Sequence, residues 1–168
     1  IGRDLTLALI KNKQEDYKQH SAKNLKTITV KNLNDTLRLG KFTVKFFQIE
    51  HSIMDAMGII IETPAGTVIH PGDWTLEHDA KGKSLLDYSH LAKLPRPTVL
   101  MLESLGALNT RRSADYETMY KNLLEILQKA EGRVIIGTFS SQVERIKWVI
   151  DAADLLGKKV ALDGYSMK

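Results

Sequence analysis

The chain has 168 residues, 43% of them hydrophobic and 26% charged, which is the composition of a folded globular protein and not of a disordered one. No apolar run approaches the roughly 18 residues of a membrane span, so no membrane association is expected. Cysteine is absent, which excludes disulfides and thiolate metal sites and leaves His, Asp and Glu as metal ligands. We expect a cytoplasmic protein, since a chain without cysteine fits a reducing compartment.

The net charge of +4 is unevenly distributed along the chain. Residues 1–50 hold ten Lys/Arg against five Asp/Glu, whereas the remainder holds 14 against 15. A basic flank beside a neutral body can steer a polyanion such as RNA or DNA. On charge alone, a solvated lysine-rich helix and loop is the simpler interpretation.

The first half of the chain is predicted to be rich in strands. It opens with a helix over residues 4–18, which has Leu5, Leu9 and Ile10 on one side. Runs rich in Thr, Val, Phe and Ile then predict four strands, the last two joined in a hairpin by Pro64 and Ala65. These strands are expected over residues 26–30, 41–49, 58–63 and 66–70.

The second half alternates strands and helices. Helices are predicted at 114–130, from its amphipathic spacing, and at 141–156, where Gly157 ends it. Short apolar strands are predicted at 98–103, 133–139 and 159–162. This order is typical of a parallel sheet covered by helices, and the composition changes near residues 95–113.

One histidine and one aspartate are placed where a metal site can be assembled. His51 follows a predicted strand, and Asp73 lies in a Gly-Asp turn after the hairpin. Imidazole and carboxylate are both ligand types for zinc or manganese, and a carboxylate can bridge two cations. A hydrogen-bonded histidine and an ordinary turn aspartate remain the alternatives.

Other polar residues follow the predicted strands of the second half. Glu103 closes an apolar strand, where ligands gather in parallel-sheet proteins; a loop carboxylate is the alternative. Ser140 and Ser141 lie where a predicted helix opens, and the N-terminus of that helix suits a phosphate; Ser166 follows the next strand in a similar way. The sequence from Ser141 to Glu144 also matches a capping box, which gives these serines a purely local role.

Taken together, these segments resemble the ribonuclease J family, nucleases of the metallo-β-lactamase superfamily with an inserted β-CASP domain. Five segments carry the resemblance in serial order, and the family patterns are His-Ser-Ile-Pro-Asp-Ser, Thr-Pro-x-Gly-x-x-x-x-Thr-Gly-Asp-Phe, Ser-Asp-Ser-Thr, Thr-Phe-Ala-Ser and Gly-Arg-Ser-Met. The matching segments of this chain are His51-Ser52-Ile53-Met54-Asp55-Ala56, Thr63 to Trp74, Leu102-Glu103-Ser104, Thr138-Phe139-Ser140-Ser141 and Gly164-Tyr165-Ser166-Met167.

The resemblance implies an α/β fold, with part of a metallo-β-lactamase αββα sandwich (residues 1–112) followed by the first βαβαβ of a β-CASP parallel-sheet domain (residues 113–168). It implies a ribonuclease that uses two divalent metal ions, zinc or manganese, with RNA as substrate and a homo-oligomeric parent protein. His51 would then be a ligand of one metal, Asp73 the bridging ligand, and Glu103 an acidic residue near the catalytic centre. Ser140, Ser141 and Ser166 would lie where RNA phosphate is held.

The chain departs from the family pattern at several positions within these segments. Pro71 stands for a usual threonine, Tyr165 for a usual arginine and Glu103 for a usual aspartate. The His-x-His-x-Asp-His cluster of the family is absent from the chain, so the resemblance implies an internal part of a longer enzyme that is inactive alone. Two alternatives stay open: a non-catalytic β-CASP relative that binds RNA, and a superfamily hydrolase acting on DNA or a small molecule.

Overall fold

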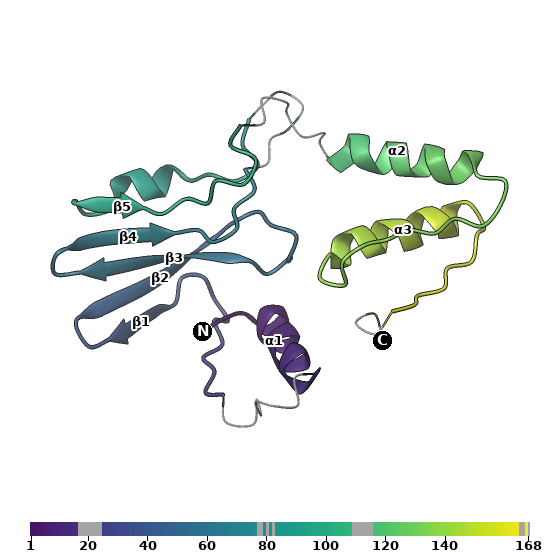
Figure 1. Ribbon diagram of the computed structural model, residues 1–168. Coiled ribbons are helices and arrows are strands. Elements are labelled where there is room, and N and C mark those ends of the chain that lie inside the picture. Colours follow the sequence, from purple (N-terminus) through teal and green to yellow (C-terminus); the bar gives the residue numbers. More distant parts are fainter. Residues whose placement is uncertain are drawn as a thin grey trace. The chain divides into compact units, whose positions relative to one another are not determined.

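The computed structural model describes residues 1–16, 25–76, 79, 81, 83–108, 116–164 and 167. The chain divides into two compact units, residues 1–107 and 108–168, and each has its own secondary structure. The first unit is built on a five-stranded sheet, and the second contains two helices with extended segments beside them (Figure 1). This mixed composition confirms the α/β class.

The sheet of the first unit is mainly antiparallel. Its strands follow chain order, and only the last pair, β4 with β5, is parallel. The bounds are β1 (Thr36–Leu39), β2 (Phe42–Gln48), β3 (Met57–Thr63), β4 (Gly66–His70) and β5 (Thr98–Leu100), with α1 (Asp4–Asp16) before them and the 3-10 helix η2 (Ser89–Lys93) before β5.

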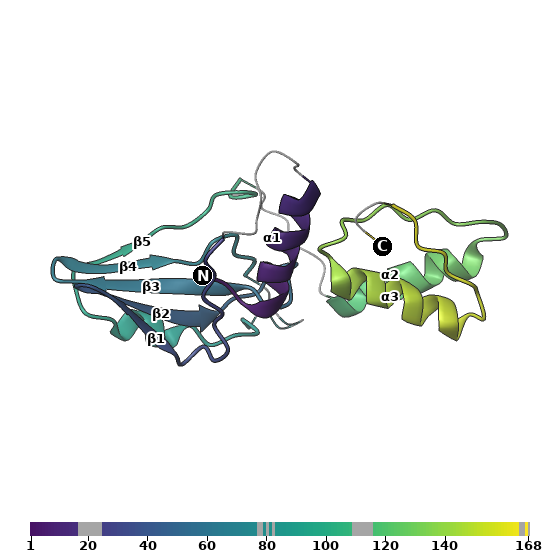
Figure 2. The same ribbon diagram turned by 90° about the horizontal axis from the view of Figure 1, so that it is seen from below.

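Side chains on β2 alternate between two apolar clusters, one on each face of the sheet. One face carries Val44 and Phe46, which pack with Val30 from the segment before β1. The opposite face carries Phe47 and, beyond the strand end, Ile49. This second cluster includes Ile60 and Ile69 from β3 and β4, and residues in and around η2, the short teal helix of Figure 2, pack against it.

The register of β2 against β3 depends on a close contact between an aromatic ring and a glycine. Phe47 lies directly opposite Gly58 in the ladder and is only 4% exposed. A Cβ atom added at Gly58 would lie 2.2 Å from Cζ of the Phe47 ring. Only glycine leaves room for the ring to cross the neighbouring strand at this position.

Most predictions for the first half agree with the structure within a residue or two. The helix begins at Asp4 as predicted and extends to Asp16, and residues 17 and 18 lie outside the described part. The prediction of a strand over 26–30 is wrong, because only Thr29 forms a bridge, to Gly2. Strand β1 lies between the predicted strands 26–30 and 41–49, where the turn formers Asn32, Asn34 and Asp35 indicated a loop and concealed the alternation of residues 37–39.

The second unit contains α2 (Tyr116–Lys129) and α3 (Val143–Leu155), which lie side by side in both views (Figures 1 and 2). Trp148 of α3 makes edge-on contacts with Tyr116 and Tyr120 of α2, with ring centroids 5.2 and 6.2 Å apart. Gly157 ends α3 as predicted: it has a φ of 65°, and its N–H donates to the carbonyl of Asp154. None of the helices in the described ranges is long and apolar enough to cross a membrane.

The two strands predicted in the second unit are not formed. Residues 133–139 and 159–162 are extended but make no ladder within the described part of the chain. Their apolar side chains are largely open to solvent, and Ile135 is 89% exposed. Apolar, β-branched runs report the propensity for a strand, whereas a strand also needs a partner for its backbone hydrogen bonds.

The β2–β3 contact leads to a stability prediction. Gly58→Ala should lower the free energy of unfolding of the first unit by about 1–3 kcal/mol, because the added methyl group forces the buried Phe47 ring to move. Urea unfolding followed by Trp74 fluorescence in a Trp148→Phe background measures this, since the chain has two tryptophans. Gly132→Ala is the control, because an added Cβ there meets nothing within 4 Å. Equal midpoints for the two variants would contradict the assigned packing.

Candidate functional site

The structure brings His51 and Asp73 together at one end of the sheet. Strands β2 and β4 run in the same direction on either side of β3, so the loops that follow them leave the sheet at the same end. His51 lies in the first of these loops and Asp73 in the second. Nε2 of His51 is 3.9 Å from Oδ2 of Asp73, although the two residues follow different strands and are 22 positions apart in the sequence.

The pair has the chemistry of a partial metal site. The His51 side chain is 28% exposed and that of Asp73 is 85% exposed, so both reach solvent. Two ligands of one tetrahedral zinc ion are about 3.4 Å apart, which is close to the separation of these two atoms. Across the described residues there is no group of three or more His, Cys, Asp or Glu that could hold a metal ion. The pair therefore has the chemistry to supply two ligands of a metal site, but not a complete set of ligands.

The turn that carries Asp73 is fixed by its own backbone and by His70. Gly72 has a φ of 75°, a conformation that L side chains rarely adopt. Its N–H donates to Nδ1 of His70 at 3.0 Å, which gives His70 a local role in the turn. A further backbone bond, from the N–H of Thr75 to the carbonyl of Glu50 at 3.0 Å, ties this loop to the one that carries His51.

The loop that carries His51 is anchored at its far end by Asp55. Oδ2 of Asp55 accepts the backbone N–H groups of Leu5 and Thr6 at 2.8 and 3.2 Å, and Oδ1 accepts the Thr6 hydroxyl at 2.8 Å. These are the unpaired donors of the first turn of α1, so a residue 50 positions away caps the helix. The sequence predicted no such role, because a cap from a distant segment has no local pattern.

A second feature was not predicted: a hydrogen-bonded group of three residues beside the pair, which we call the Glu50–Tyr88–Trp74 triad. The hydroxyl of Tyr88 donates to Oε2 of Glu50 and accepts from Nε1 of Trp74, the latter at 3.1 Å. Glu50 directly precedes His51 and Trp74 directly follows Asp73. Burial, and then the hydrogen bond to Glu50, raise the pKa of Tyr88 from its ordinary value to about 12.

The structure gives Glu103 a local partner. Strand β5 ends at Leu100, not at Glu103 as predicted, and Glu103 lies in the exposed segment that follows. Its carboxylate accepts the backbone N–H of Leu105, two residues on. This is the contact of a loop carboxylate, and the structure shows Glu103 in no contact with His51 or Asp73.

The serines of the second unit precede α3 but do not cap it. Ser140 and Ser141 are half-buried in a turn, and the N-cap of α3 is Gln142, without a side-chain capping bond. The predicted capping box from Ser141 to Glu144 is therefore wrong. The Gln142 side chain is turned aside, because its Oε1 accepts from Thr138 Oγ1 at 3.1 Å and from Arg145 Nη1 at 3.3 Å. Ser166 lies outside the described residues.

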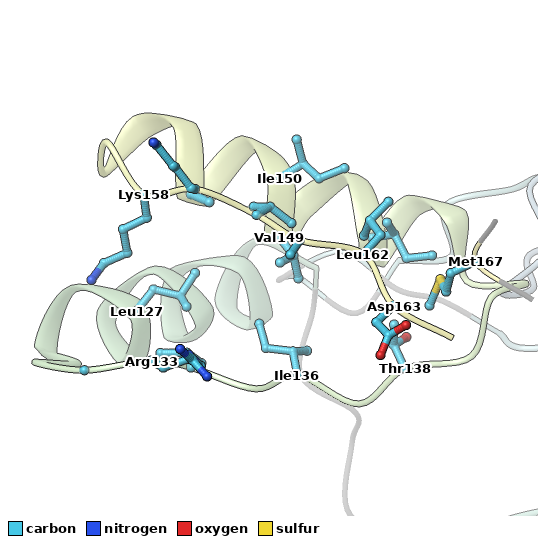
Figure 3. Close-up of a pocket in the computed structure, with 17 residues that line it drawn as sticks. Leu127, Arg133, Ile136, Thr138, Val149, Ile150, Lys158, Leu162, Asp163 and Met167 are labelled. Carbon is cyan, nitrogen blue, oxygen red and sulfur yellow. The ribbon is translucent and has the colours of Figure 1, made fainter. Parts of the chain in front are cut away.

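A hollow of about 350 Å³ lies in the second unit, between the helices and the two extended segments. Its floor is apolar and includes Ile136, Val149 and Leu162, while Arg133 and Lys158 lie toward one end (Figure 3). Asp163 and Thr138 lie toward the other end. The two extended segments, which were predicted to be strands, therefore form part of the wall of this hollow.

Comparison with known proteins identifies sequence relatives of this chain. Residues 131–168 match the family described as "Ribonuclease J, beta-CASP domain". A ribonuclease J of Thermus thermophilus is 36% identical over 99% of the chain, and one of Sinorhizobium meliloti is 38% identical over 84%. The chain is ribonuclease J-like. It spans 29% of the first relative's length and 25% of the second's.

A structural comparison agrees with the fold. A solved protein of unknown function from Enterococcus faecalis V583 superposes with a TM-score of 0.58 over 91% of this chain and 43% of its own, at 19% sequence identity. At that identity the similarity concerns the fold alone. The resemblance to ribonuclease J noted from the sequence motifs is confirmed by the sequence relatives.

The helix cap leads to a prediction for this ribonuclease J-like chain. Asp55→Ala should destabilise the first turn of α1 by about 1 kcal/mol, which lowers amide-exchange protection at Leu7 and Ala8 roughly fivefold. Asp35→Ala is the control, because Asp35 is exposed, lies outside the helix, and its carboxylate accepts the backbone N–H of Asn32 in its own turn. Equal protection in both variants would show that Asp55 does not cap the helix.

The triad leads to a prediction about pH. Since the folded state favours the neutral phenol of Tyr88, its contribution to stability is complete below pH 10 and is lost as the pH rises through about 12. Ultraviolet titration of tyrosinate, in difference mode against Tyr88→Phe, isolates one of the five tyrosines. An ionisation of Tyr88 near its ordinary pKa of 10.0 would show that the hydroxyl is not held by Glu50.

Proposed function

We propose that this chain is part of a longer metal-dependent ribonuclease that hydrolyses RNA phosphodiester bonds in the cytoplasm. The observation that carries the proposal is the approach of His51 and Asp73 to 3.9 Å at the end of the sheet. Further support comes from relatives named ribonuclease J, which are similar to this chain over 84–99% of its length. In this proposal residues 1–112 belong to a metallo-β-lactamase domain and residues 113–168 to a β-CASP domain.

The proposed role of His51 and Asp73 is to hold two divalent cations, zinc or manganese. Such cations, when bound, activate water and neutralise the charge that develops on phosphoryl oxygens. His51 offers Nε2 from a partly sheltered loop, and Asp73 offers two carboxylate oxygens that face solvent. The other ligands must come from residues beyond those described, so we propose that this chain alone does not cleave RNA.

RNA itself is proposed to contact both units. In the second unit, Ser140, Ser141 and Ser166 are the proposed phosphate contacts, at the N-terminal end of α3 and after the last extended segment. We keep Glu103 as a proposed acidic residue near the reaction, although its carboxylate is engaged by Leu105 here. The basic N-terminal region contributes less than its composition indicates, because Lys31 and Lys45 pair with Asp4 and Glu62.

The test is removal of the exposed ligand in the full-length protein. Asp73→Ala should reduce RNA cleavage by more than about a hundredfold, because loss of a partner that only orients a ligand already costs 10–100-fold. Bound metal, measured by mass spectrometry, should fall in parallel, while Asp154→Ala on the exposed face of α3 changes neither.

Substrate assays on RNA, DNA, and ester or lactam compounds separate the alternatives. RNA cleavage by Asp73→Ala at the normal rate would contradict the metal assignment. Wild-type protein that binds RNA without metal and without cleaving it would be the non-catalytic relative. Faster hydrolysis of DNA or of a small ester would instead assign the site to a different substrate.

A further inference from the structure

We propose that the Glu50–Tyr88–Trp74 triad is a positioning device that sets the spacing between His51 and Asp73. The inference rests on the proposed function, in which these two residues hold metal. It adds three residues that neither the sequence motifs nor the comparisons assign to the site. Tyr88 is the central member, because its single hydroxyl serves both of the others.

The triad connects the two loops through the immediate neighbours of the proposed ligands. Glu50 is the residue before His51, and Trp74 is the residue after Asp73. Tyr88 bonds to both side chains, and the backbone bond from Thr75 to Glu50 joins the same two segments. A shift of one loop against the other must therefore break the side-chain connection, the backbone connection, or both.

Tyr88 is itself held firmly by the core of the first unit. Its ring makes edge-on contacts with Trp74 and Phe47, at centroid separations of 4.7 and 6.5 Å. Phe47 is buried on β2 and fixed by its contact with Gly58. The triad thus transmits the rigid register of the sheet to two side chains that lie beyond its end.

The buried carboxylate of Glu50 lowers the stability of the fold. Its Oε1 atom is buried and, within the described part of the chain, has no hydrogen-bond partner. Buried polar atoms are normally paired, and an unpaired one destabilises the fold. A carboxylate kept at this position is explained by a role in which Oε2 orients Tyr88 between the two loops.

The first experiment measures position directly, without metal or activity. Histidine-ring NMR signals are recorded for the chain and for its Tyr88→Phe, Trp74→Phe and Tyr120→Phe variants. Tyr88→Phe should shift and broaden the His51 signals and leave those of His70 in place, because His70 bonds to Gly72 in its own turn. Trp74→Phe keeps an aromatic side chain but removes the indole donor to Tyr88, and should have a smaller effect because the bond from Tyr88 to Glu50 remains. Tyr120→Phe is the control, since it makes the same chemical change on α2.

The second experiment measures zinc affinity in the full-length protein by competition with a chromophoric chelator. Tyr88→Phe should weaken affinity roughly tenfold, as residues that orient metal ligands typically do, and the double variant with Trp74→Phe should weaken it little further. Unchanged His51 signals and unchanged affinity in Tyr88→Phe, even with a lowered melting temperature, would overturn the positioning role.

The proposed function fails by a different result. If Asp73→Ala binds zinc as tightly as the wild type, the pair is no metal site, whatever the Tyr88 variants do. If Asp73→Ala loses zinc while Tyr88→Phe binds normally with unmoved His51 signals, only the positioning inference is overturned.

Discussion

The arrangement of the first unit depends on the contact of the Phe47 ring with Gly58. It fixes the register of β2 against β3, and a slip of one residue would exchange the two faces of β2. The same ring meets Tyr88, so the contact also orients the residue that joins the two loops at the end of the sheet. The position of His51, four residues beyond Phe47 in the chain, relative to Asp73 therefore depends on this register.

Much of the first unit could be predicted because its signals are local. The strand over 66–70 and the start of the helix at Asp4 follow from β-branched runs, a tight turn and apolar spacing. The approach of His51 and Asp73 was predictable for a related reason: both follow strands of one antiparallel sheet, and strands on either side of a common neighbour end together.

The features that hold the site could not be predicted, because they join residues far apart in the sequence. Asp55 caps a helix 50 positions away, and Tyr88 bonds to Glu50 across 38 positions. The second unit shows the opposite error. Residues 133–139 have the composition of a strand, yet composition cannot state whether a hydrogen-bonding partner lies alongside. Local patterns thus report propensity, whereas pairing and long-range capping are properties of the folded chain.

The short and the long connections between strands lie at opposite ends of the sheet. The two tight turns, Gly40-Lys41 between β1 and β2 and Pro64-Ala65 between β3 and β4, lie at the end of the sheet opposite His51 and Asp73. A fluorescent label or a short peptide tag attached at Ala65, which is exposed in the second of these turns, is therefore expected to leave the site undisturbed. The fold therefore offers a handle for immobilising or tracking the protein without contact with its chemistry.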